Sequence, residues 1–238
     1  ADRLKATIGP GRRIAIIGGG YIGLEAAASS RALGAEAVVL EREPRLLARV
    51  ASPPLSEFFA AAHRAHGVSI HTDAQVTGLV GQNGTERGRV AGVQLADGTI
   101  LPCHAALVGV GAIPNDEIAA AAGLRCENGV VVDEHARTED PAIFAIGDLT
   151  NRPLALYGRR GRLESVPNAL EQARQAAAAI TGRPPPAAEV PWFWSDQYDI
   201  KLQMAGMAFD VANTVERGDP AKGRFAVFLL AADGALQA

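Results

Sequence analysis

Hydrophobic residues near the start of the chain follow the order strand, turn, helix, strand. Four apolar residues at positions 14–17 predict a short buried strand that runs into glycines. Small and helix-forming residues follow Gly23, and Gly34 is placed to end that helix. A second apolar run at 38–40 predicts the next strand. Residues 13–41 therefore predict one βαβ unit, the repeating element of a parallel sheet.

A second helix and strand are expected after this unit. Ser52 and Pro53 suit the N-cap and first position of a helix that reaches His66. Gly67 is placed to end this helix. Residues 68–71 then alternate between apolar and polar, which predicts a strand.

The section 74–103 differs in kind from the βαβ pattern. Two turn pairs, at residues 83–84 (Asn-Gly) and 97–98 (Asp-Gly), separate short strand-like runs. Both pairs are typical of tight hairpins, because Asn and Asp followed by Gly accept the positive φ that such turns need. We expect a small antiparallel meander that interrupts the parallel sheet.

The second half of the chain carries shorter elements. Residues 105–111 predict a buried strand that ends in glycines, where a ligand could lie. The other expected elements are a short helix capped by Asn115 and ended by Gly123, strands at 129–132 and 143–146, and a long helix at about 167–180. A proline-rich linker at 182–186 separates them from a last part, rich in aromatic residues at its start.

Composition narrows the function classes. Hydrophobic residues make up 48% of the chain and charged residues 21%, which is ordinary for a soluble globular protein. The net charge of −3 argues against a general nucleic-acid binder. No apolar run reaches the roughly 18 residues that a membrane span needs. Cys103 and Cys126 form no C-x-x-C pair, which fits a reducing cytoplasm and predicts a cytoplasmic location.

The glycines after the first strand carry a phosphate-binding pattern. Gly18, Gly20 and Gly23 have the spacing G-x-G-x-x-G between a strand and a helix. In that context they permit the tight turn, the approach of a pyrophosphate and close packing of the helix, whose N-terminus attracts anions. Glu41 ends the next strand about 20 residues later, where a dinucleotide ribose is bound. A plain βαβ turn that binds nothing is the alternative, and the acid favours a dinucleotide site.

Five further blocks, taken in order, carry a family resemblance. They are residues 18–25 (GGGYIGLE), 108–115 (VGVGAIPN), 138–148 (TEDPAIFAIGD), 164–169 (ESVPNA) and 191–198 (PWFWSDQY). Together they resemble the FAD-dependent NAD(P)H:ferredoxin and rubredoxin reductases, including the putidaredoxin reductase-like enzymes and the ferredoxin reductase components of dioxygenases. The likeness spans nearly the whole chain.

The resemblance implies an α/β fold with three parts. These are a Rossmann-like three-layer ββα NAD-binding domain with an antiparallel meander, a partial FAD domain, and a partial α+β C-terminal interface domain. The implied boundaries are a linker at 1–11, the NAD-binding domain at 12–123, the FAD-domain part at 124–186 and the interface domain at 187–238. The family also has an earlier glycine fingerprint for FAD, so we expect this chain to be an internal fragment.

The resemblance also implies an activity: a hydride passes from NADH to FAD, and electrons then pass to a ferredoxin or rubredoxin-type carrier that feeds an oxygenase. Glu25 resembles the acid that pairs with a lysine beside the flavin. The implied cofactor-binding residues are Gly18, Gly20, Tyr21, Ile22, Gly23 and Glu41 in the NAD fingerprint, Gly109 and Gly111 near the nicotinamide, Gly147 and Asp148 at the FAD ribitol, and Val166, Pro167 and Trp192 near the isoalloxazine.

Each of these readings has a simpler structural alternative. Glu25 also suits the start of any helix, because the helix dipole favours an acid there. The glycines at 109 and 111 also suit a strand-end turn, and the tryptophans at 192 and 194 also suit an interface-domain core. His63, His66 and His71 have a loosely ligand-like spacing without a Cys or Glu to complete a metal set, so we expect surface histidines and no metal.

Two expectations concern cofactor choice and partner. Glu41 should accept hydrogen bonds from ribose hydroxyls and repel a 2′-phosphate, which favours NADH over NADPH, although Arg42 could soften this preference. Arginines also cluster between 152 and 162, at Arg152, Arg159, Arg160 and Arg162. They suggest a docking loop for an acidic ferredoxin, and the alternative is a solvated loop.

Competing functions stay open from the sequence alone. One is an NADH oxidase or another enzyme of the pyridine nucleotide-disulfide oxidoreductase fold, against which the aromatic block at 191–198 counts. A second is a nucleotide-binding module without activity. The chain holds one glycine fingerprint, which Glu41 assigns to the nicotinamide cofactor. We therefore expect the isolated chain to bind NAD(H) weakly and to retain no flavin.

Overall fold

The computed structural model describes residues 2–82 and 88–238 and divides into two compact units. Unit 1 comprises Ala1–Gly111, Ser195–Leu202 and Ala208–Gln237, and unit 2 comprises Ala112–Trp194, Gln203–Met207 and Ala238. The expected turn at 83–84 lies outside the described residues. Within the described ranges, no helix is both long and apolar enough to cross a membrane.

A four-stranded parallel sheet forms the centre of unit 1. Its strands are β1 (Arg13–Ile17), β2 (Glu36–Leu40), β3 (Ser69–His71) and β7 (Ala105–Val108), in the order β3-β2-β1-β7. The register pairs Ala15 with Val38 on one side and with Ala106 on the other. This order has the first strand in the middle, as in a Rossmann half, and confirms the predicted βαβ unit and parallel sheet.

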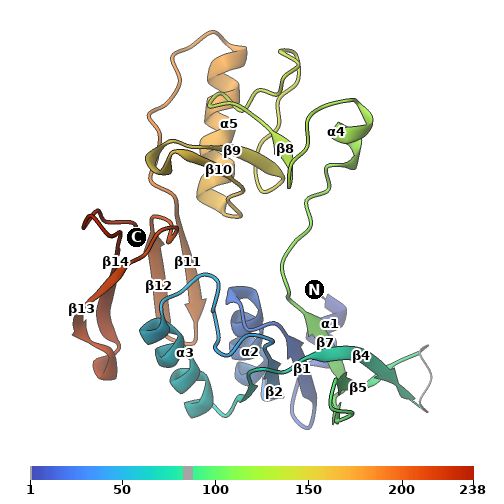
Figure 1. Ribbon diagram of the computed structural model, residues 1–238. Coiled ribbons are helices and arrows are strands. Elements are labelled where there is room, and N and C mark those ends of the chain that lie inside the picture. The colour runs from blue at the N-terminus through green and yellow to red at the C-terminus, as the bar shows by residue number, and fades with distance from the viewer. Residues whose placement is uncertain (1, 83–87) are drawn as a thin grey trace. The chain divides into compact units, whose positions relative to one another are not determined.

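Helices cover one face of this sheet (Figure 1). They are α2 (Tyr21–Ala32) and α3 (Pro53–Ala65), and a short helix α1 (Asp2–Thr7) precedes β1. Leu24 of α2 and Phe59 of α3 pack with Ile14, Ile16 and Val39 in the main hydrophobic core. The helices therefore begin and end close to the predicted positions, with Gly34 at φ +83° after the first.

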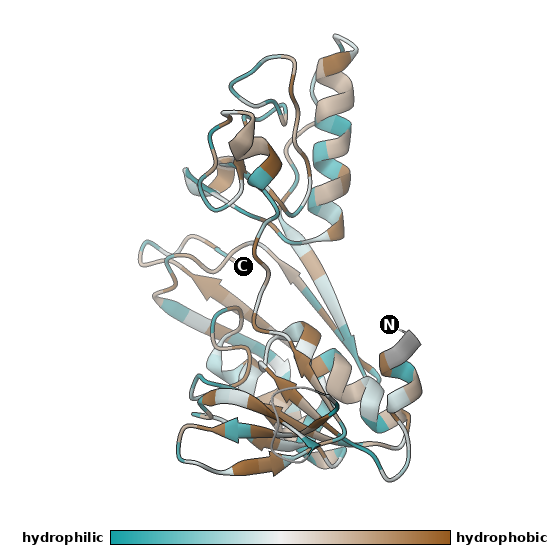
Figure 2. Ribbon diagram, turned by 90° about the vertical axis from the view of Figure 1, so that its right-hand side faces the viewer, coloured by the Kyte–Doolittle hydropathy of each residue, from teal (hydrophilic) through white to brown (hydrophobic). Residues whose placement is uncertain are grey.

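An antiparallel meander covers the opposite face. It consists of β4 (Val76–Gly81), β5 (Val90–Leu95) and β6 (Ile100–Pro102). Val93 and Cys103 are buried with Ala15 and Leu40 of the parallel sheet in a second core cluster. In Figure 2 the strands of the parallel sheet and the meander include brown, hydrophobic segments. Meander, parallel sheet and helices thus form the three layers that the family resemblance implied.

The end of the chain adds two pairs of strands. β11 (Trp192–Gln197) pairs with β12 (Ile200–Ala205), and β13 (Asn213–Asp219) forms an antiparallel hairpin with β14 (Arg224–Leu230), joined by the 3-10 turn η3 (Pro220–Lys222). Ile200 and Leu202 pack against the main core, and Phe225 contacts Phe58 of α3 edge to face with ring centroids 4.9 Å apart. Helix α3 therefore serves as a packing surface for both strand pairs.

Unit 2 contains one long helix and a small sheet. The helices are α4 (Glu117–Ala121) and α5 (Val166–Ile180), with the 3-10 turn η2 (Ala155–Tyr157) between them. The strands β8 (Val130–Val131), β9 (Thr150–Leu154) and β10 (Arg159–Gly161) lie in the order β10-β9-β8. The Ser165 hydroxyl caps α5 by accepting a hydrogen bond from the Asn168 N–H at 3.3 Å.

Two local expectations were wrong in unit 2. The N-cap of α4 is Asp116 rather than Asn115, because the helix begins one residue later than the sequence suggested. Residues 143–146 do not form a strand: their one bridge joins Phe144 to Arg137, and Ile143 and Ile146 are exposed. A strand needs a ladder of partners, and the described residues supply a single bridge here.

Gly23 offers a test of the close packing between β1 and α2. A Cβ atom at this position would lie 2.0 Å from the Gly18 carbonyl oxygen, which is backbone and cannot rotate away. We predict that Gly23→Ala lowers the free energy of unfolding by about 3 kcal/mol, measured by urea denaturation.

Gly20→Ala is the matched control for this prediction. A Cβ atom there would meet nothing within 4 Å, and the φ of −79° suits any residue. This variant should lose less than about 1 kcal/mol. Equal losses in the two variants would contradict the packing argument.

Candidate functional site

The turn after β1 needs glycine, because other backbone segments approach it closely. Gly18 has φ +108°, donates its N–H to the Leu40 carbonyl at 2.8 Å and lies under Gly109, whose oxygen would be 2.3 Å from a Cβ at position 18. Gly19 was missed from the sequence, although a Cβ there would lie 2.6 Å from the Leu46 side chain. The carboxyl ends of β1, β2 and β7 therefore meet at one glycine turn.

The N-terminus of α2 opens from this turn. Gly20 is its N-cap in extended conformation, and among the described residues no side chain caps the helix and nothing lies within 4 Å of the space beside Gly20. The backbone N–H groups and the dipole at the start of a 12-residue helix attract anions. The open space beside Gly20 and the start of the helix fit the pyrophosphate of a dinucleotide.

The neighbouring fingerprint residues differ in exposure. Ile22 is 71% exposed, whereas Tyr21 is half-buried and donates its hydroxyl to the Val50 carbonyl at 3.4 Å. Burial raises the pKa of Tyr21, so its hydroxyl stays protonated and remains a donor. Ile22 is therefore available to cover a ligand, and Tyr21 fixes the loop that follows β2.

Glu41 links this turn to the end of β2. One carboxylate oxygen accepts the Gly19 N–H at 2.6 Å, and the other accepts the Glu43 N–H at 2.8 Å. Each oxygen keeps a second lone pair, which suits a ribose hydroxyl. Arg42, the next residue, is exposed and pairs with Glu43 at 3.1 Å. The Glu41 carboxylate thus has a structural role that the sequence did not reveal.

Hydrogen bonds hold the loop after Glu41 to the glycine turn. Leu47 donates its N–H to the Gly19 carbonyl at 2.9 Å. Arg45 donates to the Ala51 carbonyl at 2.7 Å, to the Ala48 carbonyl at 2.8 Å and to the Ser56 hydroxyl at 2.6 Å. Because these bonds satisfy the loop backbone, the acid and the glycines keep a fixed spacing.

The glycines after β7 lie at the same edge of the sheet. Gly109 donates its N–H to the Ile17 carbonyl at 2.8 Å, which continues the pairing of β7 with β1. Gly111 has φ +111°, and the nearest group to a Cβ there would be the Arg49 guanidinium at 3.9 Å. The structure therefore brings both glycines, the fingerprint and Glu41 together in unit 1.

Glu25 lies in α2 and joins an unexpected buried polar network. One oxygen of its carboxylate accepts the Ser195 hydroxyl at 2.5 Å, and Ser195 in turn accepts the Gln197 amide N–H at 3.0 Å. The Gln197 oxygen lies 2.8 Å from Nε2 of His63. The Tyr198 hydroxyl lies 3.1 Å from the other ring nitrogen of His63.

The expectation of a surface histidine at position 63 was wrong. His63 is fully buried and bonds to the Gln197 and Tyr198 side chains. His66, one turn later, is exposed and stacks on the Tyr198 ring with centroids 3.7 Å apart. Within the part of the chain that the structure describes, no group of three or more His, Cys, Asp or Glu side chains could hold a metal ion.

In unit 2, Asp148 lies in a turn fixed to α5. The Gln172 oxygen accepts the Gly147 N–H at 2.8 Å and the Thr150 hydroxyl at 2.9 Å. Asp148 itself is exposed, and among the described residues nothing bonds to its carboxylate. The turn is therefore rigid while its acid stays available to accept hydroxyl groups.

Apolar side chains accompany this acid. A Cβ atom at Gly147 would lie 3.8 Å from the Ala169 side chain, so this turn lies beside the first turns of α5. Val166 there is 59% exposed and Leu170 is 55% exposed. Pro167 lies at the second position of the helix and is partly buried. An exposed carboxylate beside an apolar helix start fits a ligand that has both hydroxyl groups and a flat ring.

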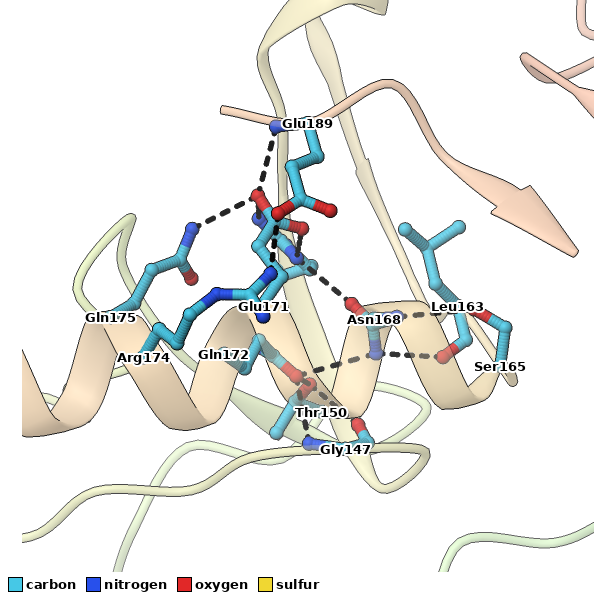
Figure 3. Close-up of polar contacts among 11 residues, drawn as sticks. Gly147, Thr150, Leu163, Ser165, Asn168, Glu171, Gln172, Arg174, Gln175 and Glu189 are labelled. Atoms are coloured by element: carbon cyan, nitrogen blue, oxygen red, sulfur yellow. Dashed lines mark hydrogen bonds and ion pairs between the residues drawn. The ribbon is translucent and has the colours of Figure 1, made fainter. Parts of the chain in front are cut away.

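A buried ion pair supports α5 (Figure 3). Arg152 donates to the Glu171 carboxylate at 2.7 and 3.3 Å and to the Asn168 oxygen at 2.8 Å. Glu171 also accepts the Gln175 amide and the Glu189 N–H, both at 3.2 Å. The charges are therefore paired and surrounded by donors, as a buried pair requires.

This network corrects the docking set expected from the sequence. Arg152 is 7% exposed and has its charge neutralised inside the unit, so it belongs to the interior. Arg162 is also largely buried and bonds to the Asp148 and Ala112 carbonyls and to Glu164. Arg159 and Arg160 are the two exposed members, although Arg160 also donates to the Asn151 carbonyl at 2.7 Å.

The tryptophans of β11 are half-exposed. Trp192 is 41% exposed and Trp194 is 43% exposed, and their ring centroids are 5.3 Å apart. Because both side chains are this exposed, they are not buried in a core within unit 2. The paired rings instead present an aromatic surface.

Comparisons with known proteins agree with this fold and site. Residues 1–173 match the family described as pyridine nucleotide-disulphide oxidoreductase, and residues 192–238 match the reductase C-terminal family. The chain belongs to the pyridine nucleotide-disulphide oxidoreductase family. This confirms the resemblance and the fold class that the sequence predicted.

Its relatives are reductases of electron carriers. The chain is 57% identical to the probable ferredoxin reductase CtmF of Castellaniella defragrans, over 96% of this chain and 55% of that protein. It is 43% identical to putidaredoxin reductase CamA of Pseudomonas putida, over 99% of this chain and 56% of that protein. The crystal structure of the covalent putidaredoxin reductase–putidaredoxin complex matches with a TM-score of 0.92 and 42% identity, over 98% of this chain and 55% of that chain. The chain thus spans about half the length of these relatives.

Burial of His63 predicts a pH dependence of stability. Burial lowers its pKa below 6.5, the hydrogen bond with Gln197 opposes this shift, and the charge of His66 adds to it. The unfolded chain takes up a proton near pH 6.5, whereas the folded protein resists it. Stability is therefore present above pH 6.5 and is lost as the pH falls toward the folded pKa, by up to about 1.4 kcal/mol per pH unit.

Urea denaturation between pH 7.5 and 5 measures this effect. The variant His63→Gln should lose less stability over this range than the unaltered protein. His71→Gln is the control, because His71 is exposed and should leave the slope unchanged. Identical slopes in all three proteins would contradict the assignment to His63.

Proposed function

We propose that this chain forms the NAD-binding part, and part of the flavin-binding part, of an enzyme that passes electrons from NADH through FAD to a ferredoxin or rubredoxin-type carrier, in the service of an oxygenase. The observation that carries the proposal is the match of residues 192–238 to the reductase C-terminal family, behind an oxidoreductase match over 1–173. The names of the relatives given above support it. A cytoplasmic location is proposed with it.

The nicotinamide cofactor fits the edge of the sheet in unit 1. The pyrophosphate would bind at the N-terminus of α2, where the N-cap is a glycine and the described residues leave the space beside it open. The ribose hydroxyls would bind to Glu41, and the nicotinamide half would lie along the glycines after β7. The residues proposed to hold NAD are Gly18, Gly20, Tyr21, Ile22, Gly23, Glu41, Gly109 and Gly111.

The flavin fits the turn and helix start of unit 2. When bound, FAD accepts a hydride and releases electrons singly, which supplies the redox chemistry. The residues proposed to hold it are Gly147, Asp148, Val166, Pro167 and Trp192. Glu25 of unit 1 is proposed as the catalytic acid of the enzyme. The proposed domain boundaries stay at 12–123, 124–186 and 187–238.

Reduction of a carrier by the full-length enzyme tests the proposal. We expect NADH oxidation, followed by absorbance, to be fast with a ferredoxin and slow with oxygen alone. Fast oxygen consumption without a carrier would instead identify an NADH oxidase. Tight NADH binding with no turnover of any acceptor would identify a binding module.

Glu41 predicts the choice between NADH and NADPH. Its carboxylate oxygens lie 2.6 and 2.8 Å from backbone N–H groups of the glycine turn and of Glu43, so the charge is fixed where a 2′-phosphate would lie. Binding titrations should give an NADH affinity at least about tenfold higher than that for NADPH. Glu41→Gln should reduce this ratio, because it removes the repelling charge. Equal affinities in the unaltered protein would show that this role of Glu41 is wrong.

The exposed arginines predict a salt-dependent partner. Reversal of Arg159 and Arg160 to Glu should slow ferredoxin reduction by the full-length enzyme about tenfold at low salt, and less at high salt. Reduction of a small neutral dye should be unchanged, because a dye needs no docking surface. The combined reversal of Arg217 and Arg224 to Glu is a charge-matched control on exposed positions of the β13–β14 hairpin. An equal loss with dye and ferredoxin would reject the docking role.

A further inference from the structure

A continuous chain of polar side chains connects α3 to the Glu25 carboxylate. It runs from Tyr198 through His63, Gln197 and Ser195 to Glu25, with contacts of 3.1, 2.8, 3.0 and 2.5 Å in that order. All of these residues lie in unit 1, although they come from three separate segments of the sequence. The mechanism proposed above assigns no role to the middle members.

The hydrogen bonds of this network are all donated in one direction, from Tyr198 toward Glu25. Gln197 donates its amide N–H to Ser195, so its oxygen must accept, and Nε2 of His63 must carry the hydrogen. In neutral His63 the other ring nitrogen is then an acceptor for the Tyr198 hydroxyl. Ser195 has one hydrogen and donates it to Glu25. Each bond thereby fixes the direction of the next one.

The interior location of the chain makes this direction consequential. Ser195 is 1% exposed, and Gln197 and His63 are 0% exposed. A buried polar group without a partner is costly, so a break at one member leaves its neighbours unsatisfied. The last hydrogen bond in this series is accepted by the Glu25 carboxylate, which is the charged end of the network. The hydroxyl–carboxylate bond is charge-assisted and short.

We propose that Ser195 is a positioning residue for Glu25, and that Gln197, His63 and Tyr198 form the relay that orients the Ser195 hydroxyl. One oxygen of Glu25 is held by Ser195, and among the described residues its other oxygen has no partner. Because Ser195 fixes the orientation of the carboxylate, the second oxygen is held in position to accept a hydrogen bond from a bound group. The inference rests on the proposed redox role of Glu25 only for its functional consequence.

A double-mutant cycle in unfolding tests the contact itself. Ser195→Ala and Glu25→Ala should each destabilise the protein, and the double variant should be no less stable than the worse single variant, because both break the same bond. Ser30→Ala is the matched control: its hydroxyl is buried in α2 and bonds to the Ala26 carbonyl at 2.7 Å. Ser30→Ala and Glu25→Ala should add. Additive losses for Ser195 and Glu25 would overturn the proposal.

The tautomer of His63 tests the relay. Nitrogen-15 chemical shifts of the imidazole should show hydrogen on Nε2 in the unaltered protein at pH 7.5. Ser195→Ala should disturb this state, because the Gln197 amide loses its acceptor and can flip. Ser195→Thr keeps the hydroxyl and should restore it. Hydrogen on Nδ1, or a tautomer insensitive to Ser195→Ala, would show that no directed relay exists.

Flavin reduction by NADH in the full-length enzyme tests the consequence. Ser195→Ala should slow the hydride-transfer step about tenfold with little change in NADH affinity, and should have no further effect when Glu25 is already Ala. Loss of rate in Ser195→Ala that persists in the Glu25→Ala background would overturn the positioning role. If Glu25→Ala itself leaves the rate unchanged, the redox role of Glu25 fails, while the unfolding cycle and the tautomer still decide the relay.

Discussion

The close approach of backbone segments at the glycine turn after β1 is the constraint on which the carboxyl edge of the parallel sheet depends. Gly18 lies under Gly109, and Gly23 lies against the Gly18 carbonyl, so two strands and a helix meet without side chains between them. This packing places the N-terminus of α2 at the carboxyl edge of the sheet. Glu41 then bonds to Gly19 and holds the next strand end to the same turn. One geometric requirement thus sets the positions of the amides, the acid and the strands.

Polar networks have the same organising role elsewhere. In unit 2, Arg152 and Glu171 are paired within a set of amides, and Gln172 fixes the turn that carries Asp148. In unit 1, Gln197 links His63 to the serine that contacts Glu25. Such groups are tolerated in the interior because nearly every donor and acceptor is matched. They specify a particular arrangement of segments, which apolar packing alone would leave less defined.

The sequence was informative where local patterns dominate. Glycine spacing, apolar runs and the acid after β2 predicted the parallel sheet, α2 and the meander, because these depend on short-range backbone and burial preferences. It failed for His63, whose burial depends on β11 arriving from more than a hundred residues away. It also failed for residues 143–146, where composition suggested a strand but partners along the described chain are too few.

The helix α5 held a signal that was overlooked. Asn168, Glu171, Gln172 and Gln175 recur at helical spacing and form its buried side. A polar stripe of this kind is typical of a solvent-facing side, and here it is buried because Arg152 pairs with it. The arginine looked like a docking residue because its pairing depends on tertiary contacts. Ser195 and Gln197 carried no such local pattern and could be found only in three dimensions.

The double attachment of Glu41 constrains how cofactor preference can evolve. A substitution that admits a phosphate must also replace two acceptors for backbone N–H groups, at Gly19 and Glu43. In the role proposed for Glu41, cofactor discrimination and loop architecture share one side chain, and a single mutational step changes both. A lineage that adopts the phosphorylated cofactor would first need another acceptor for the glycine turn, so its route passes through compensating changes in the loop at 42–52.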